Sequence, residues 1–398
     1  MFGPRFRICT LFGLPIYIDL SWFIILLLIT WSLAEGLFVE LPTILEAWRA
    51  TEATLAAAEA LAEQAGLRWV LGLVGALGLF GSVLLHELGH ARAAEMFGVP
   101  MRSITLFIFG GVAEMNEEPP SAKAEFWVAV AGPIVTVVLF ALGVFAWSLG
   151  LAVNLALPAT TIIAYLTIVN GVLLAFNMLP AFPLDGGRVL RAAIWAYSGK
   201  LTKATRITSQ IGGGFGLALI FLGLLRLFAA GDLLGAIWWA LVGLFLRAAA
   251  NMSYQRVLAR QALHGETLER FMNRHPVTVT PDLPVDELVH DFIYRYHYKM
   301  FPVVNGDGEL QGCLTIDQLK DVPRDAWPST AVGQVMERCG PDNTLRIDQD
   351  PLEALTSMHA TNKSRMMVLD DGGRLVGVVS LKDLMEFLSL KLELGEED

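Results

Sequence analysis

The pattern HELGH at residues 86–90 combines two imidazoles and one carboxylate at a spacing that suits metal chemistry. His86 and His90 stand four residues apart, so on a helix both side chains lie on one face and can bind one zinc ion. Glu87 can then take a proton from a water molecule that the zinc activates. The competing interpretation is a chance match, but the motif lies at the edge of a long apolar run, where such groups are costly unless they serve a site.

A catalytic zinc usually takes three protein ligands and leaves one position for water. No further histidine precedes residue 264, so the third ligand must be a carboxylate or Cys9. Glu114 has a spacing that a soluble zinc protease could use. Asp185 is the better candidate, because it directly follows the fourth apolar segment, on the same predicted side of the membrane as HELGH. Its competing role is that of a cap or turn residue before two glycines.

The elements that carry these residues are predicted to be membrane helices. Of the 398 residues 54% are hydrophobic and 17% charged, and the mean hydropathy is positive. A span needs roughly 20 mostly apolar residues. Six segments meet this requirement: residues 20–38, 67–85, 126–149, 158–176, 210–228 and 233–250. The sequence therefore predicts a polytopic α-helical protein of the cell membrane, embedded in the lipid bilayer.

The charge pattern predicts the orientation of this protein. An even number of spans places both chain ends on one side, and basic residues gather at the ends and between the fourth and fifth spans, which marks that side as cytoplasmic. The acidic connection at residues 39–66 should face outward as an amphipathic helix. The formal charge of −10, without a sustained basic block, argues against a nucleic acid partner.

Two other segments depart from the transmembrane pattern. Residues 101–115, with Gly110 and Gly111 near their centre, are too short to cross and predict a strand or hairpin that protein must cover or that lines a cavity. After residue 266 the chain reads as water-soluble, and residues 301–319 align with residues 366–384 without a gap. This repeat predicts two stacked copies of one small α/β unit.

We therefore expect four parts along the chain. These are a transmembrane domain at residues 1–250, a linker at 251–266, and the two α/β copies at 267–325 and 326–392.

The membrane part resembles the site-2 proteases. Members combine HExxH on one transmembrane helix with an NxxPxxPLDGG-type motif on a later one, which residues 177–187, NMLPAFPLDGG, match. The resemblance implies that His86, His90 and Asp185 bind zinc and that Glu87 is the general base.

The same resemblance suggests further site residues. Asn177 would help near the scissile carbonyl, although it could equally be the last residue of a helix. Phe109, Gly110 and Gly111 look like the family's substrate-side edge, where an unwound peptide would pair by β-addition. Gly132, within Ala131–Gly132–Pro133, resembles a family motif on the third span, with helix packing as its competing role.

The C-terminal repeat resembles a pair of CBS domains, which often bind adenine nucleotides between the copies. The GhhS/TxxD signature is present at residues 377–383, where Ser380 and Asp383 would contact phosphate and ribose. The first copy keeps Thr315 but has Gln318 in place of the usual Asp. The resemblance implies one site for ATP, ADP or AMP, or a purely structural pair that joins two chains into a homodimer.

These features favour an intramembrane zinc metalloendopeptidase that hydrolyses transmembrane or membrane-tethered proteins and is regulated through the CBS pair. A transporter or channel gated by CBS domains is the main alternative. It does not explain HELGH together with LDGG, and the spans lack the inverted repeats of many transporters. A catalytically inactive nucleotide sensor is a third interpretation, which the intact Glu87 argues against.

Overall fold

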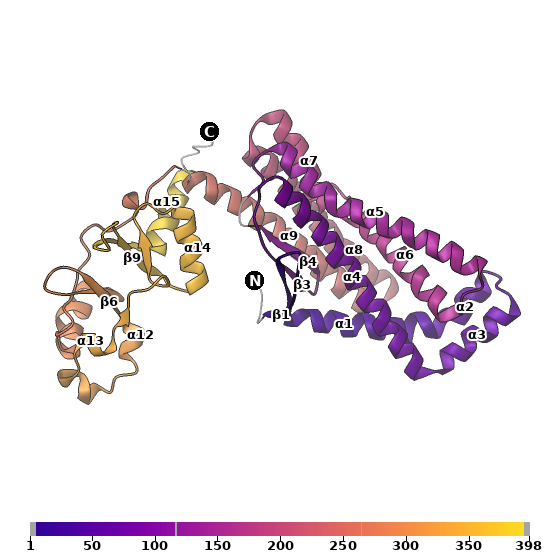
Figure 1. Cartoon of the computed structure of the whole chain (residues 1–398), viewed down its shortest axis with the longest axis horizontal. Helices are drawn as coiled ribbons and strands as arrows, with labels where there is room; N and C mark the ends of the chain where they lie inside the picture. The colour runs from indigo at the N-terminus through magenta and orange to yellow at the C-terminus, as the bar shows by residue number, and fades with distance from the viewer. Residues whose placement is uncertain (1–4, 116–117, 264, 394–398) are drawn as a thin grey trace. The chain divides into compact units, whose positions relative to one another are not determined.

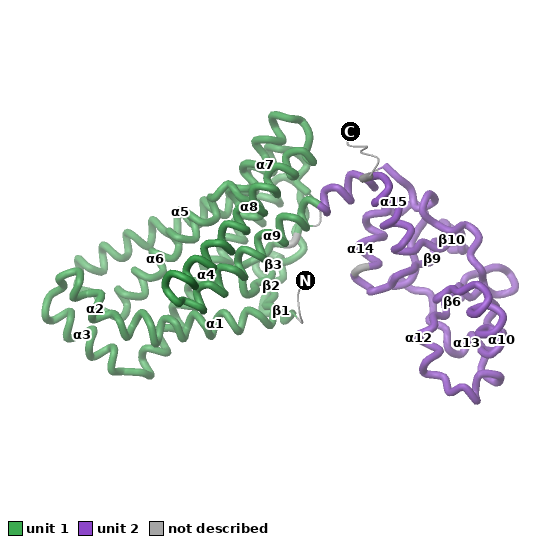
Figure 2. Tube along the Cα trace, turned by 180° about the vertical axis from the view of Figure 1, so that it is seen from behind, with its two compact units in different colours: residues 1–254 green, residues 255–398 purple. Residues whose placement is uncertain are grey.

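The computed structural model of the protein describes residues 5–115, 118–263 and 265–393. The chain divides into two compact units, unit 1 at residues 1–254 and unit 2 at residues 255–398 (Figure 2). Unit 1 contains long helices and one small sheet, whereas unit 2 contains two sheets with short helices.

Six helices in the described part of the chain are long and apolar enough to cross a membrane, as predicted. They are the continuous segment α1 (Leu20–Ser32), η1 (Leu33–Leu37) and α2 (Phe38–Ala47), and the helices α4 (Ala65–Met96), α5 (Ala122–Ala152), α6 (Leu157–Asn177), α8 (Leu201–Ala230) and α9 (Leu233–Leu263) (Figure 1). The first span is longer than predicted, because the π-helical turn η1 carries the helix on into α2. α9 also continues through most of the segment assigned to a linker. The chain is a multi-pass membrane protein.

Unit 1 also holds a four-stranded sheet in the order β1-β2-β3-β4 among the described residues. Its strands are β1 (Arg5–Leu11), β2 (Leu14–Asp19), β3 (Met101–Phe107) and β4 (Gly110–Met115). β2 and β3 run parallel, and the other two pairs are antiparallel. The hairpin of β3 and β4 confirms the prediction for residues 101–115. The hairpin of β1 and β2 is an addition to the predicted fold, and its turn places Phe12 and Gly13 at positive φ.

Two shorter helices connect the spans of unit 1. α3 (Glu52–Glu63) confirms the helix predicted within the acidic connection, and the Thr51 side chain caps it by accepting a hydrogen bond from the Thr54 N–H. α7 (Asp185–Ser198) follows the turns at residues 178–184 and ends where Gly199 adopts a φ of 70°. α7 packs against α5 and α8, so its first residue is held inside the helical bundle.

Unit 2 confirms the predicted repeat. One sheet has the order β5-β6-β7 and the other β10-β9-β8. The strands are β5 (Met300–Val304), β6 (Leu310–Thr315), β7 (Glu337–Arg338), β8 (Thr344–Arg346), β9 (Arg365–Leu369) and β10 (Leu375–Ser380). The helices are η2 (Leu268–Arg270), α10 (Val285–Glu287), η3 (Leu288–Ile293), α11 (Tyr294–Tyr296), α12 (Ile316–Leu319), η4 (Arg324–Ser329), α13 (Val332–Val335), α14 (Pro351–Thr361) and α15 (Leu381–Glu393). The copies interlock, because Asn273 bridges to Val378 in the second sheet.

Candidate metal centre

The HELGH residues lie near the C-terminal end of α4, where the helix places both imidazoles on one face. The ring centroids of His86 and His90 are 4.8 Å apart, and their Nε2 atoms are separated by 3.1 Å. Both side chains are buried. The helical spacing therefore brings the two nitrogen atoms together, as the sequence predicted.

Asp185 completes this group from the first turn of α7. Its Oδ2 lies 3.0 Å from His86 Nε2, and its Oδ1 lies 3.1 Å from His90 Nε2. In a tetrahedral zinc site with bonds of about 2.0–2.1 Å, neighbouring ligand atoms stand about 3.3 Å apart. The three donors thus have the chemistry and the mutual spacing that zinc requires. Among the described residues, this is the one group of three such side chains close enough to hold a metal ion.

Hydrogen bonds at the Nδ1 atoms of both histidines leave the Nε2 atoms available for a metal. His90 Nδ1 donates to the Val128 carbonyl at 2.6 Å, so in the neutral ring Nε2 carries a lone pair. His86 Nδ1 lies 2.8 Å from Thr136 Oγ1. Metal-binding histidines in proteins are held in this way through their second nitrogen.

The backbone of α5 approaches the same group at Gly132. A Cβ built on this residue would overlap the His90 ring, with Cε1 at 2.6 Å, and would lie 2.7 Å from His86 Nε2. A side chain here would fill the space that the two imidazoles occupy. Glycine is therefore required by the site, and helix packing alone does not explain it.

His86, His90 and Asp185 are called the metal-binding group below. Glu87 lies between this group and the sheet. Its side chain is half-buried, and a Cβ on Gly111 would lie 2.6 Å from its Cγ and 3.2 Å from its Oε1. β4 therefore runs beside the predicted general base, and Gly111 has no side chain that would separate the strand from the Glu87 carboxylate. β4 is also an edge strand of the sheet as far as the structure describes it, which leaves that edge able to pair with another strand.

The other predicted residues of unit 1 have simpler placements. Phe109 lies in the turn between β3 and β4 and stacks on Phe245 of α9, with ring centroids 4.5 Å apart. Asn177 is the half-buried last residue of α6, and its assistance to catalysis stays a prediction. Cys9 is exposed on β1, away from the metal-binding group. The side chain of Glu114 lies outside the described part of the structure.

A buried charge cluster that the sequence did not predict connects α7 to α5. Glu125 Oε1 is 2.7 Å from Arg191 Nη2 and 3.2 Å from Arg188 Nε. Glu118 adds a second carboxylate at 3.1 Å from Arg191 Nη2. Because α7 begins with Asp185, these ion pairs hold the helix that delivers the third donor.

In unit 2 the predicted nucleotide residues cap helices. Ser380 Oγ donates to Asp383 Oδ2 at 2.5 Å, before α15. Thr315 precedes α12, where the Gln318 side chain accepts a hydrogen bond from the Thr315 N–H at 2.6 Å. Gln318 thus fulfils a capping role that its amide permits.

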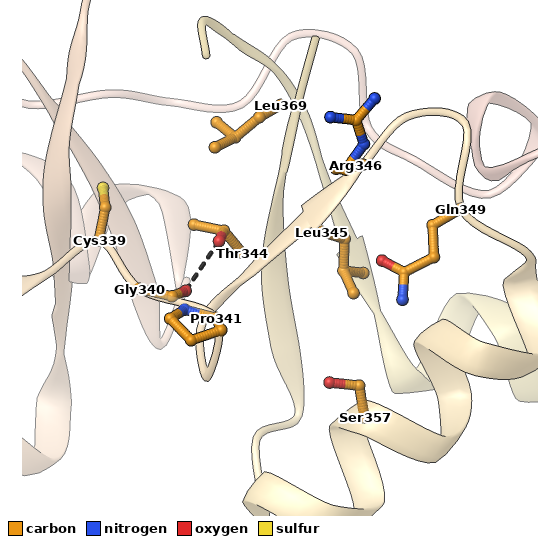
Figure 3. A pocket seen from close by; sticks show the side chains of 9 residues that line it. All are labelled: Cys339, Gly340, Pro341, Thr344, Leu345, Arg346, Gln349, Ser357 and Leu369. Carbon is orange, nitrogen blue, oxygen red and sulfur yellow. Dashed lines mark hydrogen bonds between the residues drawn. The ribbon is translucent and has the colours of Figure 1, made fainter. Parts of the chain in front are cut away.

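The structure contains a cavity of about 540 Å³ beside β8, which the sequence did not predict (Figure 3). Thr344, Arg346, Gln349 and Ser357 are among its lining residues, and Thr344 Oγ1 donates to the Gly340 carbonyl at 2.7 Å. Thr315, Ser380 and Asp383 are not among the residues that line it. The predicted nucleotide residues therefore lie apart from this cavity.

Two family models match the chain. The model of peptidase family M50 matches residues 74–156 and 149–221, and the CBS domain model matches residues 268–325 and 332–390. The first family's matches include His86, Glu87, His90 and Asp185.

Relatives extend the match over nearly the whole chain. The protein sll0528 from Synechocystis sp., provisionally named as a zinc metalloprotease, is 32% identical over 96% of this chain and 95% of its own length. Zinc metalloprotease MJ0392 from Methanocaldococcus jannaschii is 32% identical over 80% of this chain and 86% of that protein. The solved site-2 protease from Methanocaldococcus jannaschii aligns with 63% of this chain and 94% of that chain at 26% identity, with a TM-score of 0.39. The chain therefore belongs to peptidase family M50 and is a zinc metalloprotease of the site-2 protease type that carries a pair of CBS domains.

Proposed function

We propose that this protein hydrolyses peptide bonds of membrane-embedded proteins at a zinc ion held by His86, His90 and Asp185. The observation that carries the proposal is the meeting of three buried side chains near the end of a membrane-spanning helix. The two Nε2 atoms lie 3.1 Å apart, and each faces one oxygen of the Asp185 carboxylate at 3.0–3.1 Å. When bound, zinc supplies a Lewis acid that polarises a carbonyl and lowers the pKa of a water molecule. The three side chains would hold that ion, and their burial keeps bulk water away from the donor atoms.

Glu87 is the base in this scheme. It accepts the proton of the attacking water and returns it to the nitrogen of the leaving peptide. Its position beside Gly111 supports this role, because a substrate strand paired with β4 would pass close to the carboxylate. Phe109, Gly110 and Gly111 would contact this strand. An extended substrate is also required chemically, since a helix shields its own peptide carbonyls. Asn177 would assist near the scissile carbonyl.

The test compares zinc content and cleavage in three variants. We expect Glu87→Gln to keep about one zinc per chain and to lose cleavage, seen as membrane proteins that accumulate uncut in cells producing the variant. Glu95→Gln, on the same helix and paired with Arg92 at the surface, should behave as the wild type. Asp185→Asn should lose zinc. Full cleavage by Glu87→Gln, or full zinc content in Asp185→Asn, would refute the proposal.

We further propose that the CBS pair binds an adenine nucleotide and that Ser380 and Asp383 contact it, with Thr315 as the counterpart in the first copy. The support is the signature at residues 377–383 and the helix start that it forms. Isothermal titration of the full chain with ATP, ADP and AMP tests this proposal, with Asp383→Asn as the matched variant. Absence of heat with all three nucleotides would leave the pair a structural role.

Orientation and assembly complete the proposal. Both termini and the CBS pair would face the cytoplasm, and two chains would associate through the CBS pair. Labelling of engineered cysteines from either side of sealed vesicles tests the orientation. Light scattering of the purified protein in detergent tests the dimer, which a monomeric mass would contradict.

A further inference from the structure

One face of α5 carries a row of residues that contact the metal ligands or the helix α7. Glu125, Val128, Gly132 and Thr136 are spaced by three or four residues, which places them on a single stripe of the helix. Val128 accepts the hydrogen bond from His90, and Glu125 pairs with the arginines of α7. His90 and the helix that carries Asp185 are thus each bound by one residue of this stripe.

Thr136 is the member of the stripe that faces His86. It is fully buried, and its Oγ1 lies 2.8 Å from His86 Nδ1. The same hydroxyl donates to the Gly132 carbonyl at 3.3 Å within α5. Because the hydroxyl has one proton and gives it to that carbonyl, it receives the hydrogen bond from the Nδ1–H of the imidazole. The His86 ring then presents its Nε2 lone pair toward Asp185.

We propose that Thr136 is a positioning residue, which fixes the orientation and the tautomer of His86 so that Nε2 is ready to bind zinc. This proposal rests on the zinc site described above and deepens it. Without the hydroxyl, the Nδ1–H has no acceptor in a buried place, and the proton can move to Nε2, where it competes with the metal. Loss of comparable hydrogen-bond partners lowers metal affinity by about 10- to 100-fold in other zinc proteins.

The experiment measures zinc affinity of the purified full chain in detergent by competition with a chromophoric chelator. Thr136→Val keeps the shape of the side chain and removes the acceptor, so we expect zinc binding to weaken by about 10- to 100-fold. Thr136→Ser restores the hydroxyl and should bind within about threefold of the wild type. The visible absorption of the cobalt-substituted protein should change in Thr136→Val and return to the wild-type spectrum in Thr136→Ser.

Thr167→Val is the matched control. Thr167 is buried in α6, and its hydroxyl donates to the Ile163 carbonyl of its own helix at 2.7 Å. This variant loses an intrahelical hydrogen bond without touching the metal-binding group, so its zinc affinity should equal that of the wild type.

The outcomes separate this proposal from the zinc site itself. Wild-type affinity in Thr136→Val, or a loss in Thr136→Ser as large as in Thr136→Val, would overturn the positioning role and leave the zinc site intact. Equal weakening in Thr167→Val would also overturn it, because the effect would then be general to the fold. Wild-type affinity in His86→Ala would instead refute the zinc site.

Discussion

Replacement of Gly132 by alanine tests the close approach of α5 to the metal-binding group. The added Cβ would stand 2.6 Å from His90 Cε1 and 2.7 Å from His86 Nε2. Ordinary contact begins at 3.4 Å, so each imidazole would have to retreat by at least about 0.7 Å. Metal–ligand distances vary by only about 0.2 Å between sites. The variant therefore cannot keep both nitrogens at bonding distance unless α5 moves.

We expect Gly132→Ala to lower zinc affinity by at least about 100-fold, which corresponds to about 2.7 kcal/mol. Metal content after dialysis against a weak chelator and cleavage of a membrane substrate are the two measurements. Metal content and cleavage should fall together. The substitution leaves Glu87 and the β4 edge unchanged, so lost activity would reflect lost zinc.

Two glycines of the same helix provide the controls. Gly150→Ala meets its nearest neighbour, Leu155 Cδ2, at 3.4 Å and should be neutral. Gly143→Ala would overlap the Thr167 hydroxyl, so it should destabilise the fold while zinc binding persists. Retention of one tightly bound zinc and full cleavage by Gly132→Ala would refute the geometry of this site.

Three further predictions follow from the structure. Glu125→Gln removes the carboxylate that pairs with the buried Arg188 and leaves Arg191 with Glu118 alone. The free energy of unfolding in detergent should therefore fall by about 3–5 kcal/mol, and an unchanged denaturation midpoint would contradict this. Burial raises the pKa of the Cys313 thiol to about 11. At pH 8 a maleimide should therefore label the exposed Cys339 at least about tenfold faster than Cys313. Denaturation should remove this difference in labelling rate. Removal of zinc by a chelator should abolish cleavage, and added zinc should restore it; activity of the metal-free protein would exclude the mechanism.

The membrane part was largely predictable from the sequence, because a bilayer dictates the length and polarity of its spans. The helical spacing of His86 and His90 was sufficient to place their nitrogens together. Asp185 required a topological argument, since 95 residues separate it from His90. That argument placed it on the same side as HELGH, and the structure brings its carboxylate to the two histidines.

The elements that escaped prediction share one cause, which is that their signals depend on distant partners. Apolar and polar residues alternate in β1 on one side of the turn at Phe12 and Gly13. In the sequence, however, the apolar residues of β2 are continuous with those of the membrane span that follows. The contact of Glu87 with Gly111 and that of His86 with Thr136 join different elements, so no local pattern reports them. The cavity beside β8 likewise forms only when α14 packs on its sheet.

The burial of the donor group has a kinetic consequence. His86, His90 and Asp185 expose only 4%, 5% and 7% of their surface, so we expect a bulky chelator to extract an ion held between them only after local opening. Metal exchange should then proceed at the rate of that opening and become independent of chelator concentration. Because α4 and α7 must both be in place before the donors meet, acquisition of the ion becomes a late event in the maturation of the polypeptide.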